Sequence, residues 1–218
     1  LRQLPKLDPV TALGRVPELC AQASHGPNGY RSAMALNAIM RLAFVLERPE
    51  AECATPRLFR QTAERIGRLA DVALEFADQI GSDEVRAAVP HRARGYSGYG
   101  LAWCGLHSRD AAMIDEGLER LSAAVVMKHQ RTAGHWANLF RIVDSLLEKG
   151  VAGAGAAADH AGQLALASWD ENVEYTVTNR SYPRLVEHWE TKAPELADRF
   201  GENRVDGTEG RRVSHEQD

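Results

Sequence analysis

Aromatic residues gather in a glycine-rich stretch between His91 and His107. If this stretch is helical, four of its rings fall along one side of the helix. These rings are those of Tyr96, Tyr99, Trp103 and His107. Flat rings with polar edges provide contact area at low entropic cost, so such a stripe would make a binding wall if it lined a groove. The alternative is that the rings are part of the core, with their polar atoms satisfied by neighbouring groups.

A second group of basic and aromatic residues follows between residues 128 and 141. Its members are Lys128, His129, Arg131, His135, Trp136 and Arg141. If this group faces the first one across a helix pair, the two would form a basic, aromatic pocket for an anion such as a peptide carboxylate or a phosphate. The alternative is a set of loop charges that face water. The candidate binding residues are Arg94, Tyr96, Tyr99, Trp103, His107, His135, Trp136 and Arg141.

Common catalytic and metal-binding motifs are absent from the sequence. The eight histidines show no H-x-x-x-H, H-E-x-x-H or E-x-x-H spacing. The sequence also contains no P-loop, no dinucleotide-binding glycine pattern and no G-x-S-x-G elbow. We therefore predict no cofactor and no metal, although spacing alone does not test a metal site built from distant residues. Whether the protein is an enzyme stays open at this point.

The composition indicates which kinds of partner and which cellular compartment to expect. The formal net charge of -4 argues against nucleic acid as a partner. The three cysteines, Cys20, Cys53 and Cys104, are far apart, which favours thiols in a reducing compartment. No apolar run reaches the roughly 18 residues of a membrane helix, so we expect a cytoplasmic protein. The excess of arginine over lysine, with abundant alanine, is typical of a bacterial protein.

The spacing of apolar residues predicts an all-α fold. Helices are expected at residues 32–47, 58–80, 84–107, 113–125, 132–149, 155–169, 171–178 and 183–199. Only Val173 to Thr178 resembles a strand, and it is short. Short loops place consecutive helices antiparallel, so the sequence predicts antiparallel helix pairs in an α-solenoid or a helical bundle.

The positions of prolines, glycines and charged residues predict that the chain is divided into three parts. Residues 1–31 contain four prolines and are predicted to be an irregular arm with at most one short helix, near Val10 to Gln22. Residues 32–200 are predicted to form the helical domain. Residues 201–218 are charged, lack an apolar face and are predicted to be a flexible tail.

Three short segments carry a resemblance to a known family. They are Ala77–Asp83, which forms a helix end and turn, the small and large residues of Gly100–Trp103, and the helix start Asp110–Leu118. Through these segments the stretch from Leu58 to Gly150 resembles divergent tetratricopeptide-type helical repeats. Its turns near residues 81, 108, 128 and 150 depart from the period of about 34 residues in that family. The resemblance implies a concave face that binds extended peptides or partner proteins.

The main hypothesis from the sequence is an interaction module that binds a peptide or partner protein in an aromatic and basic groove. One alternative is a small helical enzyme that uses His107 or His135 as acid or base, with Arg94 or Arg141 holding an anionic small molecule. Another is the ligand-sensing domain of a bacterial regulator. The aromatic residues between Trp169 and Phe200 would either cap the helical stack or form an oligomer interface, so a homodimer stays open.

Overall fold

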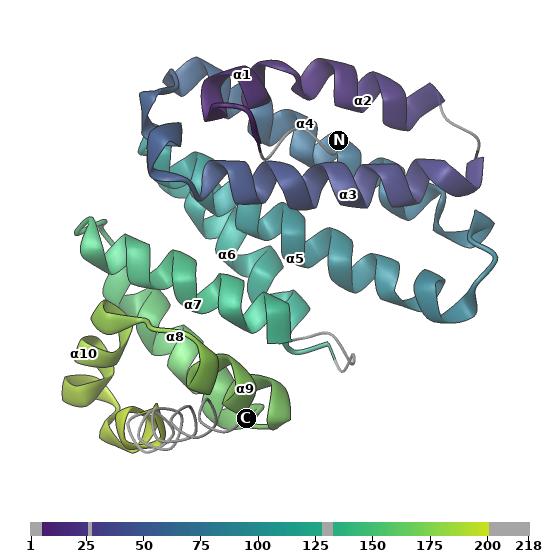
Figure 1. Cartoon of the computed structure of the whole chain (residues 1–218). Helices are drawn as coiled ribbons and strands as arrows, with labels where there is room; N and C mark the ends of the chain where they lie inside the picture. Colours follow the sequence, from purple (N-terminus) through teal and green to yellow (C-terminus); the bar gives the residue numbers. More distant parts are fainter. Residues whose placement is uncertain (1–5, 26–27, 128–132, 201–218) are drawn as a thin grey trace, which may run out of the picture. The chain divides into compact units, whose positions relative to one another are not determined.

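The computed structural model describes residues 6–25, 28–127 and 133–200 of the chain. Every regular element in these ranges is a helix, which confirms the all-α class (Figure 1). The chain divides into two compact units, Leu1–Gln130 and Arg131–Asp218, and each is described by itself. None of the described helices is long and apolar enough to cross a membrane.

The first unit contains six α-helices and two short 3₁₀ helices in its described part. They are α1 Pro9–Gly14, α2 Val16–His25, α3 Asn28–Leu46, η2 Pro49–Cys53, α4 Pro56–Glu75, η3 Ala77–Gln79, α5 Asp83–Ser108 and α6 Ala111–Val125. Short polar side chains cap the helix starts: Thr55 accepts a hydrogen bond from the Leu58 amide, Ser82 from Val85 and Asp110 from Met113. These oxygens satisfy amides that have no partner inside the helix, which is why α4, α5 and α6 begin where they do.

Helix α5 is the centre of the first unit, because it packs against α3, α4 and α6. The contacts of its glycines show how the helices run. A β-carbon on Gly98 would touch Leu121 of α6, whereas one on Gly105 would touch Ile114, so α5 and α6 are antiparallel. Helix α4 is also antiparallel to α5, since Gly100 faces Ile66 and the His107 ring stacks on Phe59. The predicted antiparallel pairing is therefore present in this unit.

The second unit is built around Phe140. Its described helices are α7 Ala133–Glu148, α8 Ala154–Ala167, α9 Glu171–Asn179 and α10 Pro183–Lys192, followed by helical residues 194–200. The Phe140 ring lies within 5.7 Å, between ring centroids, of four other aromatic rings, those of Trp136, Tyr182, Trp189 and Phe200. The predicted helix over 183–199 is interrupted at Ala193, because a residue that precedes a proline disfavours the α conformation.

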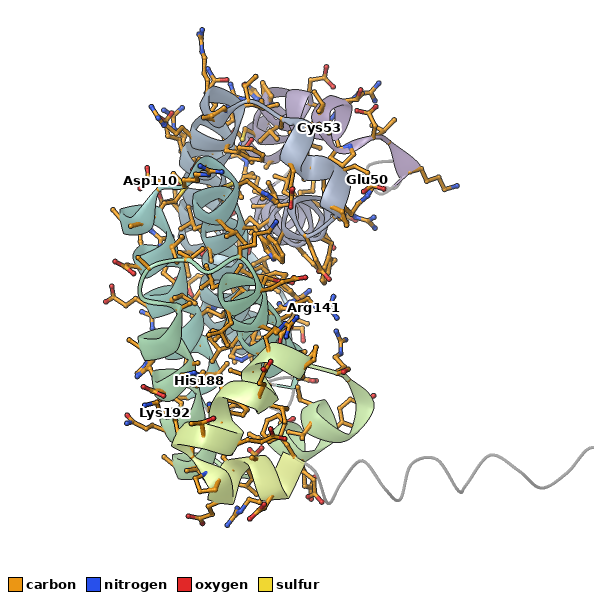
Figure 2. The ribbon with its side chains drawn as sticks, turned by 90° about the vertical axis from the view of Figure 1, so that its left-hand side faces the viewer. Glu50, Cys53, Asp110, Arg141, His188 and Lys192 are labelled. Carbon is orange, nitrogen blue, oxygen red and sulfur yellow. The ribbon has the colours of Figure 1, made fainter. Side chains whose placement is uncertain are left out.

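Two polar contacts hold α10 against α8. Figure 2 labels His188 and Lys192, one turn apart on this helix. His188 Nε2 lies 2.7 Å from Asp159 Oδ1 of α8. The Trp189 indole nitrogen donates a hydrogen bond to the Ala158 carbonyl oxygen at 2.9 Å. These contacts fix the face of α10 that meets α8.

The N-terminal segment differs from the predicted irregular arm. It contains two helices, α1 and α2, and their apolar residues Ala12, Leu13 and Val16 are completely buried. Pro9 and Pro17 do not break these helices, because Pro9 is the first residue of α1 and Pro17 the second residue of α2, where no amide hydrogen is needed. The predicted boundary between residues 31 and 32 falls inside α3. The predicted tail, 201–218, lies outside the described residues.

Candidate functional site

The rings predicted as a stripe on α5 pack in a row inside the first unit, edge-to-face between Tyr99 and Trp103 and stacked from Trp103 onward. Tyr99 is 0 % exposed and Trp103 6 %, and their ring centroids lie 6.1 Å apart. Trp103 stacks on His107 at 5.5 Å, and His107 stacks in turn on Phe59 of α4 at 5.0 Å. The stack therefore joins α5 to α4 and leaves little ring surface for a partner.

Two residues of the same stripe make polar contacts with the C-terminal end of α3. The Tyr99 hydroxyl donates a hydrogen bond to Glu47 Oε2 at 3.0 Å. His107 Nε2 lies 2.7 Å from the Leu46 carbonyl oxygen. Both contacts hold the end of α3 against α5, which is the pattern of satisfied core residues. Of the other predicted residues on α5, Tyr96 is half-buried and Arg94 is exposed.

The predicted binding residues on α7 belong to the second unit. His135 and Trp136 are buried, and the Trp136 ring lies 5.5 Å from that of Phe140. Arg141 is half-buried. Lys128, His129 and Arg131 lie outside the described residues. The two predicted walls thus come from different units, and a groove between them stays a prediction.

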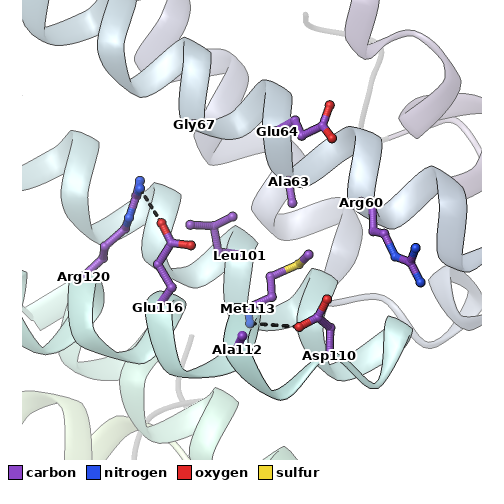
Figure 3. A pocket seen from close by; sticks show the side chains of 10 residues that line it. All are labelled: Arg60, Ala63, Glu64, Gly67, Leu101, Asp110, Ala112, Met113, Glu116 and Arg120. Carbon is purple, nitrogen blue, oxygen red and sulfur yellow. Dashed lines mark hydrogen bonds and ion pairs between the residues drawn. The ribbon is translucent and has the colours of Figure 1, made fainter.

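The first unit has an open hollow of about 450 Å³ between α4 and α6, above α5 (Figure 3). Both helices are antiparallel to α5, so they run in the same direction along the two sides of this hollow. We call it the α4–α6 groove. It is lined by Arg60, Ala63, Glu64, Gly67, Leu101, Asp110, Ala112, Met113, Glu116 and Arg120.

The α4–α6 groove has an apolar floor and charged walls. Leu101 and Ala63 are buried at its base, and Met113 is half-buried beside them. Figure 3 shows one wall formed by side chains of α4 and the other by side chains of α6. On the α6 wall Arg120 Nη2 lies 2.6 Å from Glu116 Oε1. A volume of this size falls within the range of about 300–1,000 Å³ that is common for ligand pockets.

The spacing on α4 explains why the hollow stays open. Arg60, Ala63, Glu64 and Gly67 follow one another at helical spacing, so they share one face of the helix. Ala63 and Gly67 carry little or no side chain, and a β-carbon on Gly67 would meet no atom within 4 Å. None of the residues predicted for the site lines this groove. The signal that could have indicated it is the pair of small residues, four apart, on an otherwise charged face.

A second polar cluster lies in the second unit, where residues 180–185 meet α7. Asp144 Oδ1 accepts a hydrogen bond from the Leu185 amide at 2.9 Å, so a side chain of α7 caps the start of α10. Burial raises the pKa of Asp144. Burial also lowers the pKa of Arg141, and the nearby charge of Arg180 lowers it further. The pKa of Tyr182 is raised to about 12, mainly by burial.

The described part of the chain contains no group of three or more histidine, cysteine, aspartate or glutamate residues placed to hold a metal ion. Cys104 is completely buried on α5, and burial raises the pKa of its thiol. Cys53 is exposed on η2, next to Glu52. A buried thiol with a raised pKa is a poor nucleophile, so Cys104 is a packing residue.

No protein-family model, curated protein or solved structure matches this chain. The helices pack mainly against their neighbours in the sequence, an arrangement that is compatible with a helical-repeat fold. The class that the structure defines is therefore an all-α protein of antiparallel helices.

Proposed function

We propose that the chain is a helical interaction module whose α4–α6 groove binds a short peptide segment of a partner protein. The observation that carries this proposal is the groove itself, with an apolar floor between two charged helix faces. An apolar anchor with polar contacts at the rim is the common arrangement of peptide recognition by helical scaffolds. The resemblance to tetratricopeptide-type repeats implies the same kind of partner.

The charges on the walls indicate the chemistry of the peptide. Three carboxylates and two guanidiniums line the groove, a formal balance of one negative charge. One of the guanidiniums, that of Arg120, is already paired with Glu116. Glu64 stands on the opposite wall and is exposed. We therefore propose a peptide with an apolar side chain over Leu101 and a basic residue next to Glu64.

Binding is favoured over catalysis at this groove. All its lining residues are described, and none of them is a histidine or a cysteine. The histidines of the enzymatic alternative are engaged elsewhere: His107 is stacked between two rings and His135 is buried. Cys20, Cys53 and Cys104 are thiols without a disulfide, which supports our proposal of a reducing compartment, the bacterial cytoplasm.

The test is a selection of peptides from a displayed random library on the full-length chain. The binding of the selected peptides is then measured for Glu64→Lys and Glu116→Lys. The matched controls are Glu75→Lys on α4 and Glu119→Lys on α6, both exposed and both outside the groove. We expect selected peptides that combine an apolar and a basic residue, and a loss of affinity of about tenfold or more for the groove variants only. Failure to select any peptide, or equal losses in the controls, would contradict the proposal.

A further inference from the structure

The walls of the α4–α6 groove offer few backbone hydrogen bonds to a ligand. The lining residues 60–67 of α4 and Leu101 of α5 lie at least four residues from either end of their helices. Their amides and carbonyl oxygens are therefore bonded along the helix. Among the groove walls, only the first turn of α6 has amides outside this ladder, and Asp110 Oδ1 already accepts the one of Met113 at 3.2 Å. A peptide lying extended on the groove floor would find few partners for its own backbone.

The lining side chains are also poorly suited to hold an extended backbone. An amide side chain can both donate a hydrogen bond to a peptide group and accept one from it, and so can a hydroxyl. All the lining residues are described, and none of them carries an amide or a hydroxyl. Two of the charged side chains, Arg120 and Glu116, are already paired at 2.6 Å. A peptide group without a partner costs free energy comparable to a lost hydrogen bond, so the groove disfavours an extended ligand.

The small residues of α4 leave room for the face of another helix. Ala63 and Gly67 lie one turn apart on the side of α4 that faces the groove, and a β-carbon on Gly67 would meet no atom within 4 Å. The distance between packed helices depends on the side chains at their contact, so small residues permit a close approach. Figure 3 shows this face of α4 opposite α6, with Leu101 between them.

The dimensions of the groove match one face of a short helix. The α6 wall extends from Asp110 to Arg120, which is about 15 Å at a rise of 1.5 Å per residue, or nearly three helical turns. A helix of this length and about 10 Å in diameter occupies on the order of 1,200 Å³. The groove holds about 450 Å³, so one side of such a helix would enter it and the other side would stay in solvent.

We propose that the peptide partner described under the proposed function, on which this step rests, binds the α4–α6 groove as an amphipathic helix of about three turns. A helix satisfies its own backbone, so the groove needs to supply only an apolar floor and charges at its rim. The apolar residues of the ligand helix are three or four apart and lie over Leu101, Met113 and the open space beside Gly67. A basic residue lies next to Glu64, which is exposed. This ligand differs from the extended peptides that the resemblance to tetratricopeptide-type repeats implies.

The experiment determines the conformation of a peptide selected from the displayed library on the full chain. The peptide is labelled with ¹³C and bound to unlabelled protein, and its ¹³Cα chemical shifts are measured. We expect downfield displacement from random-coil values over about ten residues, as in a helix of three turns, and apolar residues three or four apart. Upfield displacement, with apolar residues two apart, would overturn the helical ligand and leave the proposed function intact. Failure to select any peptide would contradict both.

A proline substitution in the peptide tests the same point through affinity. Proline in the middle of the peptide, at a position that faces solvent, should weaken binding by about a hundredfold, because it breaks a helix. The matched control is alanine at the same position, which should bind at least as tightly as the selected peptide. Equal affinities of the proline and alanine peptides would overturn the helical conformation.

A substitution in the protein tests whether the ligand helix packs on α4. Gly67→Leu fills the open space beside Gly67 and should weaken binding by about tenfold or more, while the fold is kept because a β-carbon there meets no atom within 4 Å. The matched control is Gly134→Leu on α7 of the second unit, where a β-carbon also meets no atom within 4 Å. Equal affinities of the two variants for the selected peptide would overturn the placement of the helix against α4.

Discussion

Gly98 of α5 and Gly117 of α6 face each other so closely that a β-carbon on either residue would lie 2.7 Å from the carbonyl oxygen of the other. Real β-carbons do not approach backbone atoms to this distance, so both positions require glycine. Gly105, further along α5, has the same relationship to the Ile114 amide nitrogen. These three glycines let α6 lie directly on α5, and this places the charged face of α6 opposite that of α4 across the groove.

Gly98→Ala is expected to destabilise the protein by about 1–3 kcal/mol, because the added methyl group meets backbone atoms that cannot move independently. The measurement is equilibrium unfolding in urea. Gly67→Ala is the matched control, since it is also inside a helix of the first unit but meets no atom within 4 Å. The control should gain up to about 1 kcal/mol from its higher helix propensity. Similar free energies of unfolding for the two variants would show that α5 and α6 do not touch at this point.

Trp103→Ala should cost about 3–5 kcal/mol of stability, because the ring is buried between Tyr99 and His107. Thermal melting followed by circular dichroism measures the loss. Trp103→Phe should cost much less, since the indole nitrogen has no hydrogen-bond partner among the described residues and most of the packing is kept. If Trp103→Ala instead kept its melting temperature and lost partner binding, the rings of α5 would be binding residues and not core residues.

Tyr182 should titrate late in a spectrophotometric titration of the tyrosines, because burial raises its pKa to about 12 from an ordinary value of 10.0. The unfolded chain loses this proton first, so the stability linked to Tyr182 is complete below pH 10 and is lost as the pH rises toward 12. In Tyr182→Phe the late step should be missing and the alkaline loss of stability smaller. An absorbance curve in which all five tyrosines ionise together would contradict this assignment.

The three thiols should react at different rates with an aromatic disulfide reagent. Cys53 is exposed and should react first. Cys20 is half-buried and Cys104 fully buried, and burial raises the pKa of both thiols, which reduces the thiolate that attacks the reagent. Cys104 should therefore react only when the first unit unfolds. Cys53→Ser should remove the fast phase alone, and a fast phase that persists in this variant would show that another thiol is accessible.

The sequence predicted most of the helices, whereas the binding residues that it indicated stay a prediction. Apolar spacing and short polar caps located most helices, because these signals are local: the oxygens of Ser82 and Asp110 act on amides three residues away. The expectation of an irregular N-terminal segment differs from the structure, since Pro9 and Pro17 lie in the first turns of helices and do not interrupt them. The division between residues 130 and 131 falls between two predicted helices, and no change of composition marks it.

The candidate site was harder to predict because it depends on contacts between distant residues. The stripe on α5 has the composition of a binding wall. However, Tyr99 and His107 make polar contacts with Glu47 and Leu46, which lie about fifty or more residues earlier in the sequence. The α4–α6 groove combines residues 60–67 with residues 110–120, and these meet only because glycines bring α5 and α6 together. Likewise, nothing in the local sequence places Tyr182 against Phe140.

The central claim is that the α4–α6 groove receives a peptide, and a paramagnetic label tests it most directly. A peptide selected on the full-length chain would carry a nitroxide next to its apolar residue, and the amide signals of the isotope-labelled protein would be recorded with and without it. We predict that broadening is strongest for the amides of residues 60–67 on α4 and 112–120 on α6, and that it disappears in Glu64→Lys. Broadening centred on any other helices, with these two segments unaffected, would contradict the claim.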